Sequence, residues 1–198
     1  MKIENGVLTD VKREDLELLQ NQPEKFWENV KVIGPYAFKD SRVTSVAIPE
    51  GVEKLDERAF SDCKFLEAIA IPRSIDRISP NAFRWCWSLT KVLMPESVRY
   101  IDDFAFASCE KLEKIYIPDG VEVIGRSAFE HCHLLEKIVL PEGVKALGAR
   151  AFNHCGRLKE VFVLAQDTKI DEKAFEGMNA GTKIYIRDEK QDEGQELE

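Results

Sequence analysis

The sequence contains no apolar run that approaches the roughly 18 residues of a membrane-spanning helix. Its opening, Met1-Lys2-Ile3-Glu4, has no apolar stretch after the lysine and therefore lacks the pattern of a secretory signal. No Asn-x-Ser/Thr glycosylation acceptor is present, and the 5 cysteines are an odd number, which does not suit a disulfide framework. We therefore expect no membrane insertion and favour a cytoplasmic location.

An excess of basic charge is also missing. Lys and Arg number 28 against 36 Asp and Glu, which gives a net charge of −8. Proteins that hold nucleic acid without regard to sequence need a surplus of Lys and Arg to replace counterions along the phosphates. The composition therefore predicts no nucleic-acid partner.

The motifs of common catalytic sites are absent as well. The sequence has no Gly-x-Gly-x-x-Gly, no P-loop, no His-Glu-x-x-His and no Gly-x-Ser-x-Gly. We expect a protein that is not an enzyme and that needs no cofactor.

What the sequence does contain is an internal repeat. The dipeptide Ala-Phe occurs seven times, with a first interval of 22 residues and then intervals of 23. Five prolines, from Pro49 to Pro141, keep the same spacing of 23. So do the cysteines, which are Cys63, Cys86, Cys109, Cys132 and Cys155. Because three residue types share one period, we infer that one structural unit is repeated along the chain.

One unit, read from Gly120, is Gly-Val-x-x-Ile-Gly-x-x-Ala-Phe-x-x-Cys-x-x-Leu-x-x-Ile-x-Ile/Leu-Pro. Residues 138–140 alternate with period two, which predicts a three-residue strand ended by Pro141. Residues 121–124 resemble a second short extended piece, and residues 127–131 a tight helical turn or short helix. Glycines such as Gly125 and Gly143 mark corners where a side chain would be costly.

A single unit is too small to fold alone. Ordering it costs roughly 35 kcal/mol of conformational entropy at ~1.5 kcal/mol per residue. Its inward side chains return only about 2 kcal/mol each. Units must therefore stack, so the pattern predicts an α/β repeat solenoid: a right-handed coil, strand-poor and turn-rich, with one short parallel strand per 23-residue repeat.

The unit resembles the BspA-like subclass of leucine-rich repeats, whose signature is close to Leu-x-x-Ile-x-Ile-Pro-x-x-Val-x-x-Ile-Gly-x-x-Ala-Phe-x-x-Cys. The match runs from about residue 30 to residue 186. The resemblance implies a leucine-rich-repeat solenoid of a kind common in gut and oral bacteria and in some mucosal protists. Many such proteins are surface adhesins, so a cell-surface or secreted location is the alternative that the family suggests. The family has no catalytic residues to transfer.

The two ends depart from the repeat. Residues 1–29 predict an N-terminal cap with a short strand near residues 3–8 and a helical turn at residues 15–20, which Pro23 ends. Residues 30–186 predict the solenoid, of about seven coils. Residues 187–198 carry six acidic and two basic side chains and predict an acidic, disordered tail.

Three clusters could carry chemistry, and each has a plainer interpretation. The cysteines could be reactive, but their positions favour a buried, reduced ladder. His131, His133 and His154 fall in adjacent turns and could hold zinc or nickel, yet surface turns also tolerate histidine, and we predict no metal site. Trp85 and Trp87 flank a cysteine and either pack on a neighbouring coil or form a contact site.

The strand face is the more informative region. If residues 138 and 140 point inward, residue 139 points outward, and its equivalents form one apolar stripe. The stripe and the lysines beside it are the candidate partner-binding residues: Leu93, Tyr116, Val139, Phe162, Tyr185, Lys91, Lys114 and Lys137. Such residues also suit strands for their own sake.

Two functions remain open at this stage. One is a non-enzymatic binding module that presents the apolar, lysine-lined face to a protein or peptide, with a glycan also possible. The alternative is a structural or self-associating spacer or adhesin unit without a small-molecule ligand. The sequence predicts no particular oligomeric state.

Overall fold

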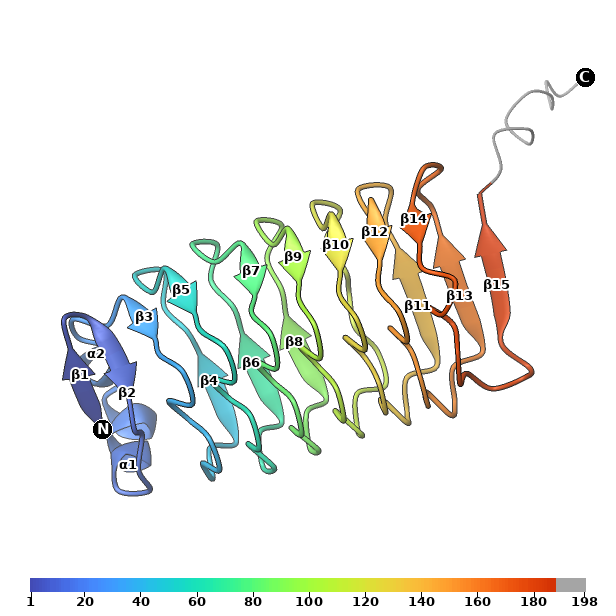
Figure 1. Ribbon diagram of the computed structural model, residues 1–198. Coiled ribbons are helices and arrows are strands. Elements are labelled where there is room, and N and C mark those ends of the chain that lie inside the picture. The colour runs from blue at the N-terminus through green and yellow to red at the C-terminus, as the bar shows by residue number, and fades with distance from the viewer. Residues whose placement is uncertain (188–198) are drawn as a thin grey trace, which may run out of the picture.

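The computed structural model describes residues 1–187, so the predicted tail lies outside the described residues except for Arg187. The chain forms a row of stacked coils that runs from the N-terminal cap to the last strand (Figure 1). Within residues 1–187, no helix is long and apolar enough to cross a membrane.

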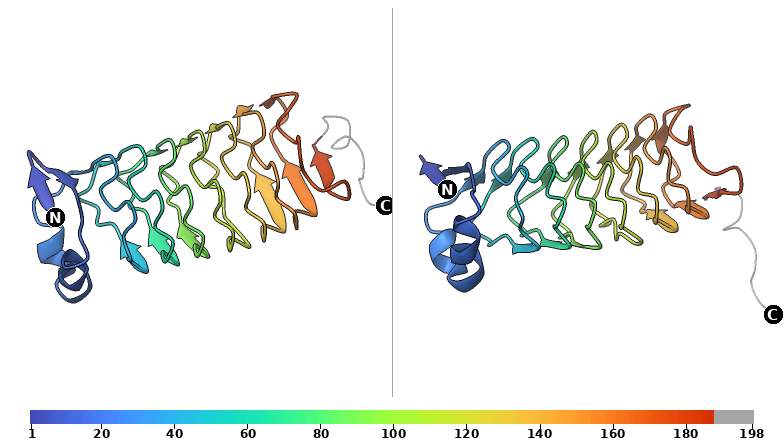
Figure 2. Two further views of the ribbon diagram at one scale, coloured as in Figure 1. Left: turned by 60° about the horizontal axis from the view of Figure 1, so that its bottom comes forward. Right: turned by 90° about the horizontal axis from the view of Figure 1, so that it is seen from below.

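The first coil is preceded by a hairpin and two short helices. Strands β1 (Lys2–Glu4) and β2 (Val7–Thr9) pair antiparallel. Helices α1 (Asp15–Asn21) and α2 (Pro23–Phe26) follow and lie to one side of the first coil (Figure 2). Pro23 therefore begins a second helix rather than only ending the first, which suits proline because its missing N–H is not needed in a first turn.

Most coils contribute a strand to each of two parallel ladders, not to one. The first ladder holds two-residue strands: β3 (Val32–Ile33), β5 (Lys54–Leu55), β7 (Arg77–Ile78), β9 (Tyr100–Ile101), β10 (Val123–Ile124), β12 (Ala146–Leu147) and β14 (Lys169–Ile170). The second holds longer strands: β4 (Ser45–Ala47), β6 (Ala68–Ala70), β8 (Lys91–Leu93), β11 (Lys137–Leu140), β13 (Glu160–Val163) and β15 (Lys183–Ile186). The prediction of one strand per repeat was incomplete, because the second extended piece also forms strands. The first ladder is divided into two sheets between β5 and β7, and the second between β8 and β11.

The turn after each first-ladder strand is not helical. Two residues in most coils have a left-handed backbone, for example Ser127 (φ 51°) and His131 (φ 58°). Their N–H groups donate to the next coil, not to residues four back in the same chain: Ser127 to the carbonyl of Ala149 at 2.9 Å and His131 to that of Asn153 at 2.8 Å. Of the tight helical turn or short helix expected at residues 127–131, only a tight turn forms, in which the Glu130 N–H donates to the Ser127 carbonyl at 3.1 Å. No helix forms, because coil-to-coil hydrogen bonds replace the helical ones.

The core is a file of stacked phenylalanines. Phe38, Phe60, Phe83, Phe106, Phe129 and Phe152 are each 0% exposed. From Phe60 to Phe152 the ring centroids of neighbouring coils lie 5.2–5.7 Å apart with interplanar angles of 18° or less. This repeated burial is what makes a coil stable on its neighbour.

The predicted cysteine ladder is confirmed, and the structure adds a reason for cysteine. All five thiols are free and 0% exposed. Each thiol donates a hydrogen bond to the carbonyl of a phenylalanine in the preceding coil, as Cys109 does to Phe83 at 3.3 Å and Cys132 to Phe106 at 3.3 Å. Cysteine fits here because it is small, apolar and still a weak donor.

The glycine corners are close approaches between coils. A Cβ on Gly143 would lie 2.2 Å from the carbonyl oxygen of Asp119, and one on Gly125 would lie 2.6 Å from the backbone nitrogen of Asp103. No side chain fits at such distances without moving the backbone of the preceding coil.

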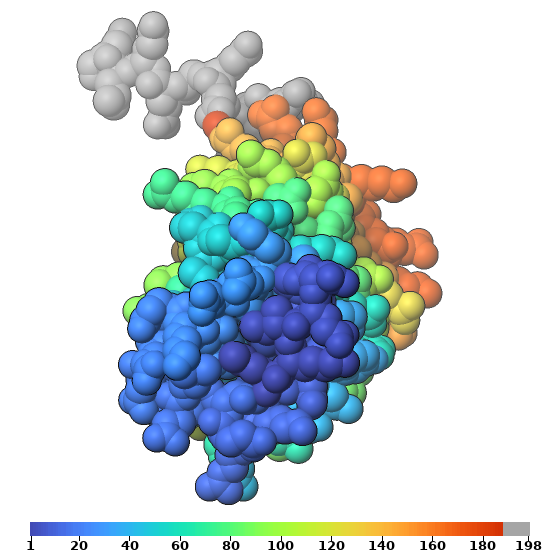
Figure 3. Space-filling view, turned by 90° about the vertical axis from the view of Figure 1, so that its left-hand side faces the viewer, coloured from blue at the N-terminus to red at the C-terminus, as the bar shows by residue number. Residues whose placement is uncertain are grey.

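The two ends of the stack differ. The cap covers the N-terminal end with a closed surface (Figure 3), and Phe26 and Trp27 are 0% and 7% exposed. In β4, the first strand of the second ladder, the inward Val46 is 2% exposed. At the other end, the inward Ile184 and Ile186 of β15 are 38% and 52% exposed.

Candidate binding groove on the strand face

The strand face is the outward surface of the second ladder. Its predicted alternation is confirmed in β11, where Ile138 and Leu140 are 1% and 0% exposed and Val139 between them is 39% exposed. Neighbouring strands pair in the predicted register, so that Val139 lies beside Phe162, and Phe162 beside Tyr185.

The face is interrupted at residues 114–117. The second ladder consists of two separate three-stranded sheets, β4-β6-β8 and β11-β13-β15, and the segment between them belongs to neither. Within residues 1–187, no backbone N–H or carbonyl of residues 114–117 is hydrogen-bonded to another backbone group. The strand predicted here does not form, so Tyr116 does not join one unbroken stripe from Leu93 to Tyr185.

A groove of about 740 Å³ opens beside this interruption. It extends over four coils, and Tyr116 and Val139 provide its apolar surface together with Ile115. Its lining residues are Lys114, Ile115, Tyr116, Ile117, Asp119, Glu136, Lys137, Val139, Pro141, Lys159, Glu160, Leu164, Gly181 and Lys183.

The apolar residues predicted to bind a partner differ in their exposure and in whether they line the groove. Tyr116 is 57% exposed, and its hydroxyl donates to Glu96 Oε1 at 3.1 Å, which together with partial burial raises the pKa of Tyr116. Phe162 is only half-exposed, because it stacks on Tyr185 with ring centroids 4.7 Å apart. Phe162, Tyr185 and Leu93 do not line the groove.

Two neighbouring coils of the groove carry a glutamate and a lysine in opposite order. The third coil of the groove carries Lys159 and Glu160 where the second carries Glu136 and Lys137. The exchange lets neighbours pair, with Lys137 Nζ 3.8 Å from Glu160 and Lys159 Nζ 3.5 Å from Glu136.

The remaining two lysines of the groove are not neutralised in this way. Within residues 1–187, Lys114 and Lys183 take part in no ion pair. The predicted Lys91 lies outside the groove, whereas Lys159 lines it and was missed. The reversal of the Glu-Lys order at residues 159 and 160 was the signal that could have identified it.

The histidine cluster is brought together, but not in the way a metal requires. The rings of His131 and His154 stack with centroids 4.7 Å apart and an interplanar angle of 13°. His133 Nδ1 lies 3.1 Å from the carbonyl oxygen of His154. Burial is the main cause that lowers the pKa of His131. The neighbouring His154 and His133 lower this pKa further, whereas Glu130 acts in the opposite direction. Within residues 1–187, no three His, Cys, Asp or Glu side chains are placed to share a metal ion.

The two tryptophans have different environments. Trp85 is half-buried, and the guanidinium carbon of Arg84 lies 4.0 Å from its ring centroid. Trp87 is 42% exposed, with Lys64 Nζ 4.8 Å from its ring. Packing therefore explains Trp85, whereas Trp87 remains an exposed aromatic outside the groove.

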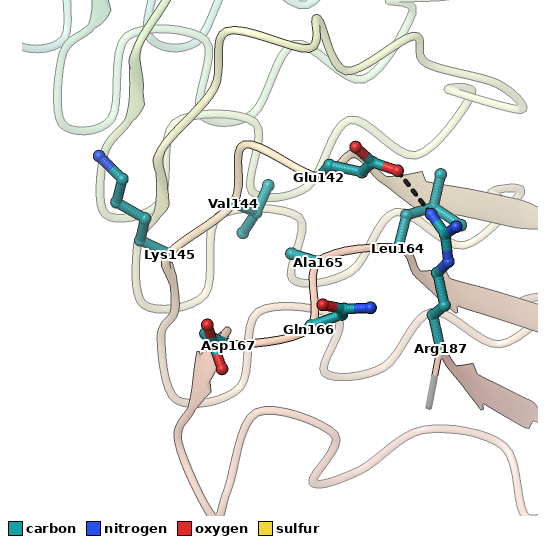
Figure 4. A pocket seen from close by; sticks show the side chains of 8 residues that line it. All are labelled: Glu142, Val144, Lys145, Leu164, Ala165, Gln166, Asp167 and Arg187. Atoms are coloured by element: carbon teal, nitrogen blue, oxygen red, sulfur yellow. Dashed lines mark hydrogen bonds and ion pairs between the residues drawn. The ribbon is translucent and has the colours of Figure 1, made fainter. Parts of the chain in front are cut away.

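A second hollow, of about 440 Å³, lies where residues 164–167 depart from the repeat pattern (Figure 4). Across its mouth Arg187 Nη1 donates to Glu142 Oε1 at 2.6 Å. Lys145 turns away toward Glu122, which it contacts at 2.8 Å. Because three of its four charged side chains are already paired, this hollow is a weaker candidate than the strand-face groove.

Comparison with known proteins identifies the family. The model of the BspA type leucine rich repeat region matches in six copies over residues 22–135 and 100–195. The chain belongs to the BspA-type leucine-rich repeat family. No curated protein matches the chain.

Solved structures agree with this assignment. A leucine-rich repeat protein from Bacteroides ovatus is similar, with 32% identity, a TM-score of 0.64, and coverage of 80% of this chain and 41% of that one. One from T. pallidum has 31% identity, a TM-score of 0.61 and coverage of 62% and 60%. A leucine rich cell surface protein from Faecalibacterium prausnitzii has 25% identity, a TM-score of 0.63 and coverage of 82% and 53%. The chain thus spans between 41% and 60% of these three proteins. The family indicates a protein-interaction or structural role.

Proposed function

We propose that the chain is a protein-interaction module whose strand-face groove binds an extended, acidic segment of a partner protein. The observation that supports this proposal is the groove itself. At the interruption of the ladder, a largely apolar hollow of about 740 Å³ is bordered by four lysines, of which two have no ion-pair partner within residues 1–187.

The groove favours an extended ligand because it runs across four adjacent coils. Strands lie about 4.8 Å apart, so four coils span roughly 15 Å, which is the length of a four- or five-residue extended peptide. Val139 and Tyr116 offer apolar area of the kind that anchors interfaces, and exposed aromatic anchors commonly contribute about 2 kcal/mol or more.

The charge favours acidic side chains on that ligand. Lys114 and Lys183 lie at opposite ends of the groove, with the self-paired Lys137 and Lys159 between them. An approaching carboxylate can pair with a free lysine without breaking an existing ion pair. Such complementarity mainly raises the association rate and is reduced by salt.

The test uses a labelled peptide that alternates glutamate with leucine, and fluorescence anisotropy as the measurement. We expect binding that weakens as salt rises and that falls at least about tenfold in the double variant Lys114→Glu with Lys183→Glu. A second variant, Tyr116→Ser, should also weaken binding by about tenfold or more.

Matched controls are available on the same chain. The double variant Lys111→Glu with Lys173→Glu changes the net charge equally, but neither residue lines the groove. Phe65→Ser removes an aromatic side chain of similar exposure, 50% against 57%. Equal losses in the control and the groove variants would overturn the proposal. Tighter binding of a control peptide that alternates lysine with leucine would overturn it as well. Retention on a glycan array, lost with Tyr116→Ser, would instead assign the groove to a sugar.

A further inference from the structure

We infer that the partner segment in the groove is held by its own backbone, as a strand added to the open edge of β11. This inference rests on the proposed function, because it concerns the same groove and the same extended acidic segment. It deepens that function by making main-chain groups, and not side chains alone, the recognition surface. The observation that carries it is that, among residues 1–187, β11 has a strand neighbour on one side only.

Strand β11 directs unused hydrogen-bonding groups toward the groove. Leu140 faces β13, because its carbonyl accepts from the N–H of Leu164 at 2.9 Å. Alternate residues of a strand direct their N–H and carbonyl groups to opposite sides, so Lys137 and Val139 direct theirs away from β13 and toward the interruption. Both residues line the groove. A ligand in the groove therefore lies beside an unpaired strand edge.

The preceding coil leaves this edge open. In a continuous ladder residues 114–117 would pair with β11 as β13 does on its other side. Within residues 1–187, however, none of their backbone groups is hydrogen-bonded to another backbone group. The separation also reaches the inward side, where Ile115 is only partly buried although Ile138, its equivalent in β11, is buried. An open edge of this kind pairs readily with another strand.

The edge of β8, on the other side of the interruption, is the weaker candidate. Among residues 1–187 β8 also has a single strand neighbour, β6. None of its residues 91–93 lines the groove, however, whereas Lys137 and Val139 of β11 both do. We therefore assign the added strand to β11.

Strand addition sets the sequence that the partner needs. Successive side chains of a strand point to opposite faces, so one alternate set lies outward beside the lysines and the other lies inward toward Ile115. Acidic residues suit the outward set, because Lys114 and Lys183 take part in no ion pair within residues 1–187. Apolar residues suit the inward set. Proline is excluded where the partner's N–H faces β11.

The experiment measures binding of the labelled glutamate-leucine peptide to the full chain and to the variant Val139→Pro. Proline removes the N–H that faces the groove and leaves the hydrogen bonds between β11 and β13 in place. We expect the dissociation constant to rise at least about tenfold while the melting temperature stays within a few degrees of the parent. The control Val139→Ala keeps the N–H but loses apolar area, and it should raise the dissociation constant less than about threefold.

Two readouts need no variant, and they decide the matter if Val139→Pro does not fold. The Val139 amide should exchange at least about tenfold more slowly, by NMR, once the peptide saturates the chain. Two further peptides carry N-methyl groups on every glutamate or on every leucine. Their affinities should differ at least about tenfold, because only one alternate set of N–H groups faces β11.

The outcomes distinguish this inference from the proposed function. Peptide binding that is lost with Lys114→Glu and Lys183→Glu, but survives Val139→Pro and leaves Val139 exchange unchanged, would overturn strand addition and keep the groove. Equal effects of the two N-methylated peptides, or of proline and alanine at residue 139, would also overturn strand addition alone. A glutamate-leucine peptide that does not bind at all would overturn both.

Discussion

The two sides of the solenoid differ in continuity at the same coil. The turn side consists of the first ladder and the turn that follows each of its strands. There Phe106 stacks on Phe129 with ring centroids 5.5 Å apart, Cys132 donates to the Phe106 carbonyl, and strand β9 pairs with β10. On the strand side, residues 114–117 of that very coil pair with neither neighbour. At this coil the stacked phenylalanines, the cysteine hydrogen bond and the first ladder hold neighbouring coils together, which leaves the strand side free to open a groove.

The largest effect is expected on the turn side. Phe106 lies fully buried between Phe83 and Phe129, so Phe106→Ala should leave a cavity and lower the free energy of unfolding by about 3–5 kcal/mol. Phe175 is half-exposed in the last coil, so Phe175→Ala should lower the free energy of unfolding by clearly less. Urea unfolding measures both. Equal losses would mean that the file of phenylalanines is not the source of stability.

An intermediate effect should come from the thiols at high pH. Burial raises the pKa of Cys155 to about 12, and it also raises the pKa of Cys132. A raised folded-state pKa contributes stability that is complete below the unfolded pKa of about 8.5 and is lost as pH rises from there toward the folded value. We expect roughly 1 kcal/mol lost per thiol for each pH unit above about 8.5.

Urea unfolding at several pH values between about 7.5 and 10 checks this expectation. The variant Cys155→Ala should show a shallower decline than the parent, whatever its stability at neutral pH. A decline that is unchanged by the substitution would assign the pH dependence to other groups.

The smallest effect on stability is expected on the strand side. Tyr116 is 57% exposed, and within residues 1–187 its only side-chain hydrogen bond is to the exposed Glu96, so Tyr116→Ser should change the free energy of unfolding by no more than about 0.5 kcal/mol. Thermal unfolding provides the measurement. A loss of several kcal/mol would show that Tyr116 packs within the chain and is not available to a partner.

Much of the architecture could be predicted from the sequence because the repeat fixes which side chains face inward. The spacing of 23 placed the phenylalanines, the cysteines and the outward Val139 correctly. The segment that contains Ala-Phe was expected to be a tight helical turn or a short helix, since its residues are compatible with a helix, and only a turn forms. The residue types at its left-handed positions, among them Asp62, Ser108 and His131, were the overlooked signal.

The groove could not be predicted in the same way. Residues 114–117, Lys-Ile-Tyr-Ile, have the same alternation as Lys137–Leu140, yet only the latter forms a strand. Periodicity shows which side a residue faces, but pairing depends on how closely neighbouring coils approach. That spacing is set by the whole stack and not by the segment itself.

The most direct test of the account is amide hydrogen exchange at the interruption, measured by NMR on the full chain. The reference is β13, whose residues 160–163 pair with strands on both sides. We predict that the amides of residues 114–117 exchange at least about tenfold faster than those of β13, because their N–H groups have no backbone partner among residues 1–187. Equal protection of the two segments would mean that the ladder is continuous and that the groove beside Tyr116 does not exist.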